Sequence, residues 1–229
     1  MLSSPYRPAS PSRRAFFRRA GLGLGAVAAA SALPACDSVD PMTDRGPLTL
    51  DFASDAGVLN YAYALEQLEA AFYAAVLADD RFPVAFSSAE QLVLRDLAAH
   101  EAIHRDVLAA AIAAAGATPL RDLRFTFDDI EIDDREAVLT AALAFEDLGV
   151  SAYNGAGRFL TSDAYLTLAG KIVSVEARHA SVVAGLITPN AIAGAGAIDA
   201  RGLDAAAAPA DVLAAASAFI DDEITVVNA

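Results

Sequence analysis

Two Glu-x-x-His motifs in this chain combine residue types and a spacing that could support chemistry. Glu101 and His104 form the first motif. Glu176 and His179 form the second. On an α-helix, positions i and i+3 share a face, so each motif can direct a carboxylate and an imidazole at one point. Carboxylates and imidazoles are ligands for iron, manganese and similar divalent cations, so the motifs predict a metal site.

The two motifs belong to an internal repeat of the chain. Before the first motif, Glu66 stands seven residues ahead of Tyr73. Before the second, Glu146 stands seven residues ahead of Tyr153. The order Glu-x6-Tyr followed by Glu-x-x-His therefore occurs twice, which predicts two similar halves that contribute equally to one site.

The neighbours of these glutamates on their helix faces are apolar. Glu176 shares its helix face with Ile172 and Val183, and Glu146 shares its helix face with Val150. An ionised carboxylate that is buried without a partner costs several kcal/mol, and bound divalent metal would offset that cost. We therefore expect an interior site for two metal ions, held by four carboxylates and two imidazoles: Glu66, Glu101, His104, Glu146, Glu176 and His179.

The elements that must position these residues are four amphipathic helices. Apolar residues recur at helical spacing over residues 54–78, 87–115, 134–160 and 162–187. Ser87 and Glu90 form a capping box at the start of the second helix. Residues 116–133 form a connection long enough to cross the bundle, and residues 124–132 alternate like a short strand. The predicted fold is all-α, a four-helix bundle with a long crossover between helices two and three, plus a short helix over residues 210–220.

The first 36 residues have the layout of an export signal. A basic region is followed by an apolar stretch that ends at Cys36, and Arg13 with Arg14 resembles the twin-arginine export motif. Residues 33–36 resemble a lipoprotein box, in which Cys36 becomes lipidated, and cleavage after Ala32 is the alternative. We expect an exported protein of the periplasm or cell envelope, anchored to a membrane by lipid if Cys36 is modified.

The predicted organisation has four parts. Residues 1–36 are the signal, 37–51 a tether, 52–188 the bundle, and 189–229 an Ala/Gly-rich linker with the C-terminal helix.

The hydrophobic content of 55% excludes disorder as the main state. Residues 1–35 hold five Arg and no acid, which leaves 11 basic and 30 acidic residues in the rest. An acidic body of this kind repels phosphate backbones and argues against nucleic-acid binding.

The repeated motif order resembles the ferritin-like superfamily of di-metal carboxylate proteins, and within it the desiccation-related ferritin-like proteins. The resemblance covers about residues 52–187 and extends to the tail at 212–220. It implies that the six residues named above bind two iron or manganese ions. It also implies that Tyr73 and Tyr153 stand behind the ligands, where they support them or form radicals.

Two further residues have alternative interpretations. Glu69 lies one turn from Glu66 and faces the same way, and its partner in the repeat is Gly149, which would leave space for a longer side chain. Glu69 is either a seventh, exchangeable ligand or an acid at the edge of the core. His100 lies one turn before His104 and either hydrogen-bonds near the site or packs between helices.

Three functions remain open from the sequence. The first is an oxidoreductase that reacts with dioxygen or peroxide as a ferroxidase, peroxidase or catalase. The second is metal storage or sequestration without turnover. The third is a structural stress protein in which metal only stabilises the bundle. The motifs select neither the metal nor the reaction, and they leave open whether the chain forms a homo-oligomer.

Overall fold

The computed structural model describes residues 45–229. The predicted export signal, with Arg13, Arg14 and Cys36, lies outside the described residues, as does most of the predicted tether. Within residues 45–229, no helix is long and apolar enough to span a membrane.

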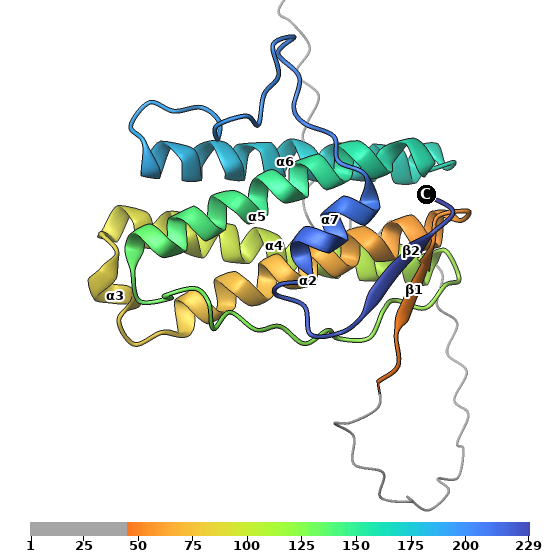
Figure 1. Cartoon of the computed structure of the whole chain (residues 1–229), viewed down its shortest axis with the longest axis horizontal. Helices are drawn as coiled ribbons and strands as arrows, with labels where there is room; N and C mark the ends of the chain where they lie inside the picture. The colour runs from red at the N-terminus through yellow and green to blue at the C-terminus, as the bar shows by residue number, and fades with distance from the viewer. Residues whose placement is uncertain (1–44) are drawn as a thin grey trace, which may run out of the picture. The chain divides into compact units, whose positions relative to one another are not determined.

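Four long helices form the body of the described chain (Figure 1). Helix α2 packs along α4, and α5 packs along α6, so the bundle consists of two helical hairpins. The connection between α4 and α5 crosses the bundle, which confirms the predicted all-α fold with a long crossover. The bounds are Asp55–Ala78 for α2, Ser88–Ala114 for α4, Arg135–Ala156 for α5 and Asp163–Ile187 for α6.

Side chains at the helix starts explain where three of these helices begin. The Ser54 hydroxyl accepts from the Gly57 N–H at 3.2 Å at the start of α2. The predicted capping box is present at α4, where the Ser87 N–H donates to Glu90 Oε2 at 2.8 Å. Asp134 caps α5. A short helix that the sequence did not predict, α3 (Phe82–Ala85), fills the turn between α2 and α4.

Two buried polar residues of α2 hold the crossover against the bundle. Asn60 Oδ1 accepts from the Leu120 N–H at 2.8 Å, and Gln67 Oε1 accepts from the Leu123 N–H at 2.9 Å. The predicted strand over residues 124–132 is reduced to a single antiparallel bridge between Phe125 and Ile220. Around this bridge the Thr126 N–H donates to Phe219 O and the Asp221 N–H donates to Arg124 O, whereas Ile130 bonds back to Phe127 within the crossover, so the ladder does not continue into a strand.

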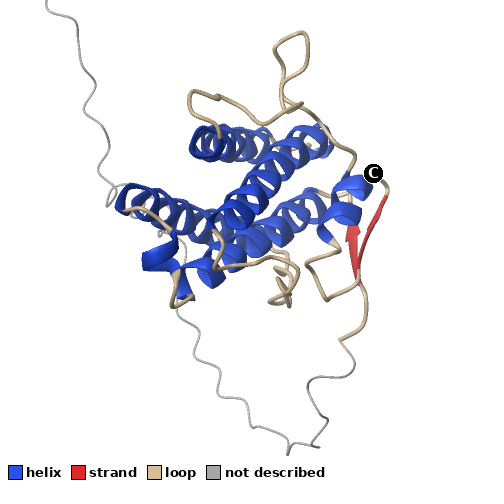
Figure 2. Cartoon of the chain, turned by 60° about the vertical axis from the view of Figure 1, so that its left-hand side comes forward, coloured by secondary structure: helices blue, strands red, loops and turns tan. Residues whose placement is uncertain are grey.

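The two ends of the described chain meet in a small parallel sheet. Strand β1 (Leu48–Asp51) pairs with β2 (Ile224–Val227), and Figures 1 and 2 show them side by side. Residues 48–51 therefore correct the predicted tether, because Leu50 is buried against the core and the strand belongs to the folded unit. The predicted helix 210–220 is also corrected. Helix α7 (Pro209–Ala216) ends early, since the following residues turn toward the bridge at Ile220.

The buried carboxylate of Asp222 ties the tail to the crossover. It accepts from the Arg121 guanidinium at 3.0 Å and from the Arg124 N–H at 2.9 Å. Burial opposes ionisation of Asp222, but these contacts outweigh it and lower its pKa. The tail is thus fixed to the bundle by an ionised group as well as by the two strands.

Candidate metal centre

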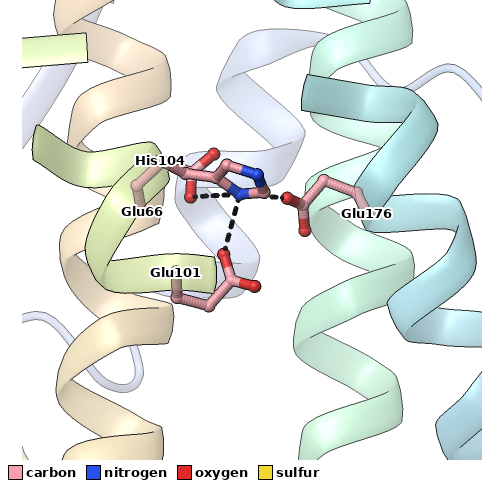
Figure 3. Close-up of side chains that lie close together, drawn as sticks. All are labelled: Glu66, Glu101, His104 and Glu176. Atoms are coloured by element: carbon pink, nitrogen blue, oxygen red, sulfur yellow. Dashed lines mark hydrogen bonds and ion pairs between the residues drawn. The ribbon is translucent and has the colours of Figure 1, made fainter. Parts of the chain in front are cut away.

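All six predicted ligands lie in the interior of the bundle. Helices α2 and α5 each contribute one glutamate, and α4 and α6 each contribute a glutamate and a histidine. The four glutamates have no exposed surface, and both histidines are buried. Figure 3 shows His104 between Glu66, Glu101 and Glu176, which approach it from three different helices.

The six side chains form two overlapping groups of four. In each group, one possible ligand atom from every residue lies within 4.8 Å of the others. Glu101 and Glu176 belong to both groups. Carboxylates shared in this way can bridge two metal ions, since each has two oxygens. The groups are Glu66, Glu101, His104 and Glu176, and Glu101, Glu146, Glu176 and His179.

The two histidines face the shared carboxylates in the same manner. His104 Nδ1 is 2.7 Å from Glu176 Oε1, and His179 Nδ1 is 2.7 Å from Glu101 Oε1. Each histidine thus meets the glutamate of the other motif most closely. Each Nδ1 also lies near the remaining glutamate of its group, at 3.5 Å from Glu66 Oε2 and 3.4 Å from Glu146 Oε2.

Several of these atoms are close together but do not form hydrogen bonds. Within the described chain, both oxygens of Glu176, Glu101 Oε1 and His179 Nδ1 have no hydrogen-bond partner, although all are buried. Unpaired buried polar atoms are rare and costly. Short distances without hydrogen-bond directions are expected when the lone pairs point at a common third atom. The residues present therefore fit a metal pair.

Two tyrosine hydroxyls each hold one oxygen of Glu66 and Glu146, the two glutamates that belong to only one group of four. The Tyr73 hydroxyl on α2 donates to Glu146 Oε1 on α5 at 2.6 Å. The Tyr153 hydroxyl on α5 donates to Glu66 Oε1 on α2. In both glutamates the second oxygen, Oε2, is left without a hydrogen-bond partner from the described residues and faces a histidine. Each tyrosine therefore holds the glutamate of the other repeat so that one oxygen is free to bind metal.

The pKa values show how the chain balances these charges without metal. Burial raises the pKa of Glu66 well above its ordinary value and that of Glu146 to about 8. Burial also opposes ionisation of Glu101, but its two histidine contacts outweigh it and lower that pKa to about 2. The carboxylate contacts of His104 and His179 likewise outweigh burial and raise both pKa values to about 12. In the metal-free chain, protons on these side chains therefore supply the positive charge that divalent cations would otherwise supply.

Glu69 occupies the space that the sequence predicted beside Gly149. A Cβ atom on Gly149 would lie 2.8 Å from Glu69 Oε1, so the missing side chain accommodates the carboxylate. Glu69 is buried but lies outside both groups of four. Burial raises its pKa well above the ordinary value, and the nearby carboxylates, Glu176 first, raise it further. Its role as a seventh ligand stays a prediction.

Glu69→Gln is expected to stabilise the metal-free chain by about 1–3 kcal/mol at neutral pH. The raised pKa means that folding must protonate Glu69, whereas the unfolded chain leaves it ionised. The gain should therefore be nearly absent below about pH 4 and grow as the pH rises. Urea unfolding at two pH values measures it, with the exposed Glu131→Gln as the control. A gain that does not change with pH, or that the control shares, would contradict this account.

The structure also gives His100 a partner that the sequence did not identify. His100 Nδ1 lies 3.0 Å from His179 Nε2, and the two rings are nearly parallel, with their centroids 5.1 Å apart. The sequence placed His100 near the site, but the contact joins α4 to α6. Spacing along one helix could not reveal it.

Comparisons with known proteins identify the family and the fold of this chain. A family model described as a ferritin-like domain matches residues 54–189. Among solved structures, a conserved hypothetical protein from Mycobacterium tuberculosis is similar with a TM-score of 0.52 and 16% sequence identity, over 61% of this chain and 94% of that one. At this identity the likeness concerns the fold alone. The search of curated proteins found no match.

Proposed function

The chain belongs to the family of ferritin-like domain proteins, and from this premise we propose that it is an exported protein that binds a dinuclear iron or manganese centre. We propose further that it oxidises metal ions or reduces dioxygen or peroxide, in protection against stress such as desiccation. The observation that carries the proposal is the pair of buried four-residue groups that share Glu101 and Glu176.

The proposed ligand set follows from which atoms are free. Glu66 and His104 would hold one metal ion, and Glu146 and His179 the other. Glu101 and Glu176 would bridge the two ions. Each ion would then have one carboxylate and one imidazole of its own and two shared carboxylates. Such a ligand set suits iron or manganese, which accept carboxylate and imidazole together. When bound, the metal pair would supply the electrons exchanged with an oxidant.

The chain's own residues prepare this site for a small oxidant. The tyrosine hydroxyls orient Glu66 and Glu146, and burial keeps both phenol groups protonated by raising their pKa values well above the ordinary range. Tyr153 also lines an apolar cavity of about 20 Å³, together with Ala62 and Leu108. A volume of that size admits about one water-sized molecule, which favours dioxygen or peroxide over an organic substrate.

A redox assay tests the proposal. The chain loaded with iron(II) should show a change in its visible and near-ultraviolet absorption when air or peroxide is added. Glu146→Ala should abolish most of this change, because it removes a ligand and releases Tyr73. Glu136→Ala, an exposed acid on the same helix, is the matched control. A metal-loaded parent that responds to neither oxidant would overturn the redox function, and uptake of many iron ions per chain would indicate storage instead.

Export is supported by the sequence at Arg13, Arg14 and Cys36. We expect the chain in the cell-envelope fraction of a bacterium that has the twin-arginine pathway. Changing both arginines to lysine should retain it in the cytoplasm, and Cys36→Ala should release it from membranes if the cysteine is lipidated. Unchanged fractionation of the double lysine variant would contradict the twin-arginine assignment.

A further inference from the structure

We propose that His100 is a positioning residue for His179 and that it makes the two metal positions unequal in affinity. The inference rests on the dinuclear centre proposed above. It starts from the contact between the rings of His100 and His179, which continues outward from a ligand to an exposed residue.

The geometry assigns each nitrogen of His179 a separate task. Nδ1 faces the carboxylates of Glu101 and Glu146, and Nε2 lies 3.0 Å from His100 Nδ1. With metal on Nδ1, the ring proton must sit on Nε2, from which it is donated to His100 Nδ1. The ring planes differ by only 9°, so the contact also fixes the orientation of the imidazole. A ligand histidine held in this way has one tautomer and a more basic nitrogen toward the metal.

The other ligand histidine has no such support. Nε2 of His104 makes no hydrogen bond within the described chain, and the carboxylate contacts of His104 all involve Nδ1. The repeat explains the difference. His100 precedes His104 by four residues and reaches His179 on α6, whereas the residue four positions before His179 is Val175. Valine cannot accept a hydrogen bond, so the two repeats differ at this position.

An unequal site follows from this difference between the repeats. Loss of a group that orients a ligand histidine typically weakens metal binding by about 10–100-fold. The position formed by Glu146 and His179 should therefore bind metal more tightly than the position formed by Glu66 and His104. The two ions should load in sequence, the supported position first.

The experiment titrates iron(II) into the metal-free full-length chain in the absence of oxygen and measures the heat of binding by calorimetry. The parent should bind in two steps that differ by about 10–100-fold in affinity. His100→Ala should weaken the tighter step by about that factor and leave the other unchanged. His100→Gln, whose amide oxygen can accept the hydrogen bond from His179 Nε2, should restore part of the affinity of the tighter step. Because His100 is exposed, these variants should fold.

Val175→His is the reciprocal variant, because Val175 is the position of the second repeat that is equivalent to His100. It places an acceptor where His104 Nε2 has none, so it should strengthen the weaker step. Mössbauer spectra of the iron-57 protein give a second readout, because His100→Ala should alter one of the two iron signals and not the other. A purely structural role of His100 would instead lower the melting temperature and weaken both steps equally.

The outcomes separate this inference from the proposed function. A parent that binds neither iron(II) nor, in the same titration, manganese(II) refutes the dinuclear centre itself. A parent that binds two ions with two steps unchanged by His100→Ala refutes the role of His100 and leaves the centre intact. Equal weakening of both steps also refutes it, since the proposal requires that one position alone responds.

Discussion

Replacing Glu101 and Glu176 together with alanine is expected to lower the iron or manganese content of the chain from about two ions to almost none. These two residues are the only ones that belong to both groups of four, so their loss leaves each position with one carboxylate and one imidazole. A single carboxylate and a single imidazole cannot compete with water for iron or manganese at micromolar levels. Metal analysis by mass spectrometry on the purified chain measures the effect.

The matched control for this variant is Asp96→Ala with Asp163→Ala. These exposed acids lie on the same two helices and change the net charge by the same amount. The control should retain its metal, which would separate coordination from general attraction of cations by an acidic protein. A double glutamate variant that keeps about two ions, or a parent that takes up neither iron nor manganese, would show that the clustered carboxylates do not bind metal.

Removing the metal from the parent chain should lower its melting temperature by about 10 °C. Metal that binds the folded state alone, at 1,000 times its dissociation constant, stabilises that state by about 4 kcal/mol. For a chain of this size, each kcal/mol corresponds to about 2–4 °C. The buried carboxylates add to the contrast, because in the metal-free chain several must carry protons, as the raised pKa values of Glu66 and Glu146 indicate.

Scanning calorimetry with and without a chelator measures this difference. The Glu101→Ala, Glu176→Ala variant serves as the control, because its melting temperature should be the same in both conditions. A parent whose melting temperature ignores the chelator, although metal analysis finds ions in it, would mean that the ions bind outside the folded core.

The helices and the clustering of the six predicted ligands were accessible from the sequence because both depend on local spacing. The i, i+3 relation of Glu101 to His104 fixes their common face once a helix forms, whatever the remainder of the fold. Apolar periodicity in turn requires that this face be buried. The space beside Gly149 was predictable for the same reason, since the repeat aligns it with Glu69.

Contacts between helices were not accessible in the same way. The repeat shows that Tyr73 and Tyr153 are equivalent, but it does not show that each meets the glutamate of the opposite repeat. That exchange depends on how α2 and α5 pack. The contact of His100 with His179 depends on the distance between α4 and α6, which no pattern within either helix encodes.

The small sheet was missed because its strands are short and far apart along the chain. Four residues that alternate once are too few to distinguish a strand from a linker. Their stability comes from the pairing of Leu48–Asp51 with Ile224–Val227 and from the burial of Leu50, both of which exist only in the folded chain.

The same strand pairing sets an order on events at the ribosome. All four long helices are synthesised before residues 224–227, so most of the bundle is made while β1 still lacks its partner. Strand β1, which directly follows the N-terminal segment, is completed only when translation has passed residue 227. Until then, the edge of β1 that will pair with β2 stays open to other chains. The parallel pair therefore forms last, after every long helix has been made.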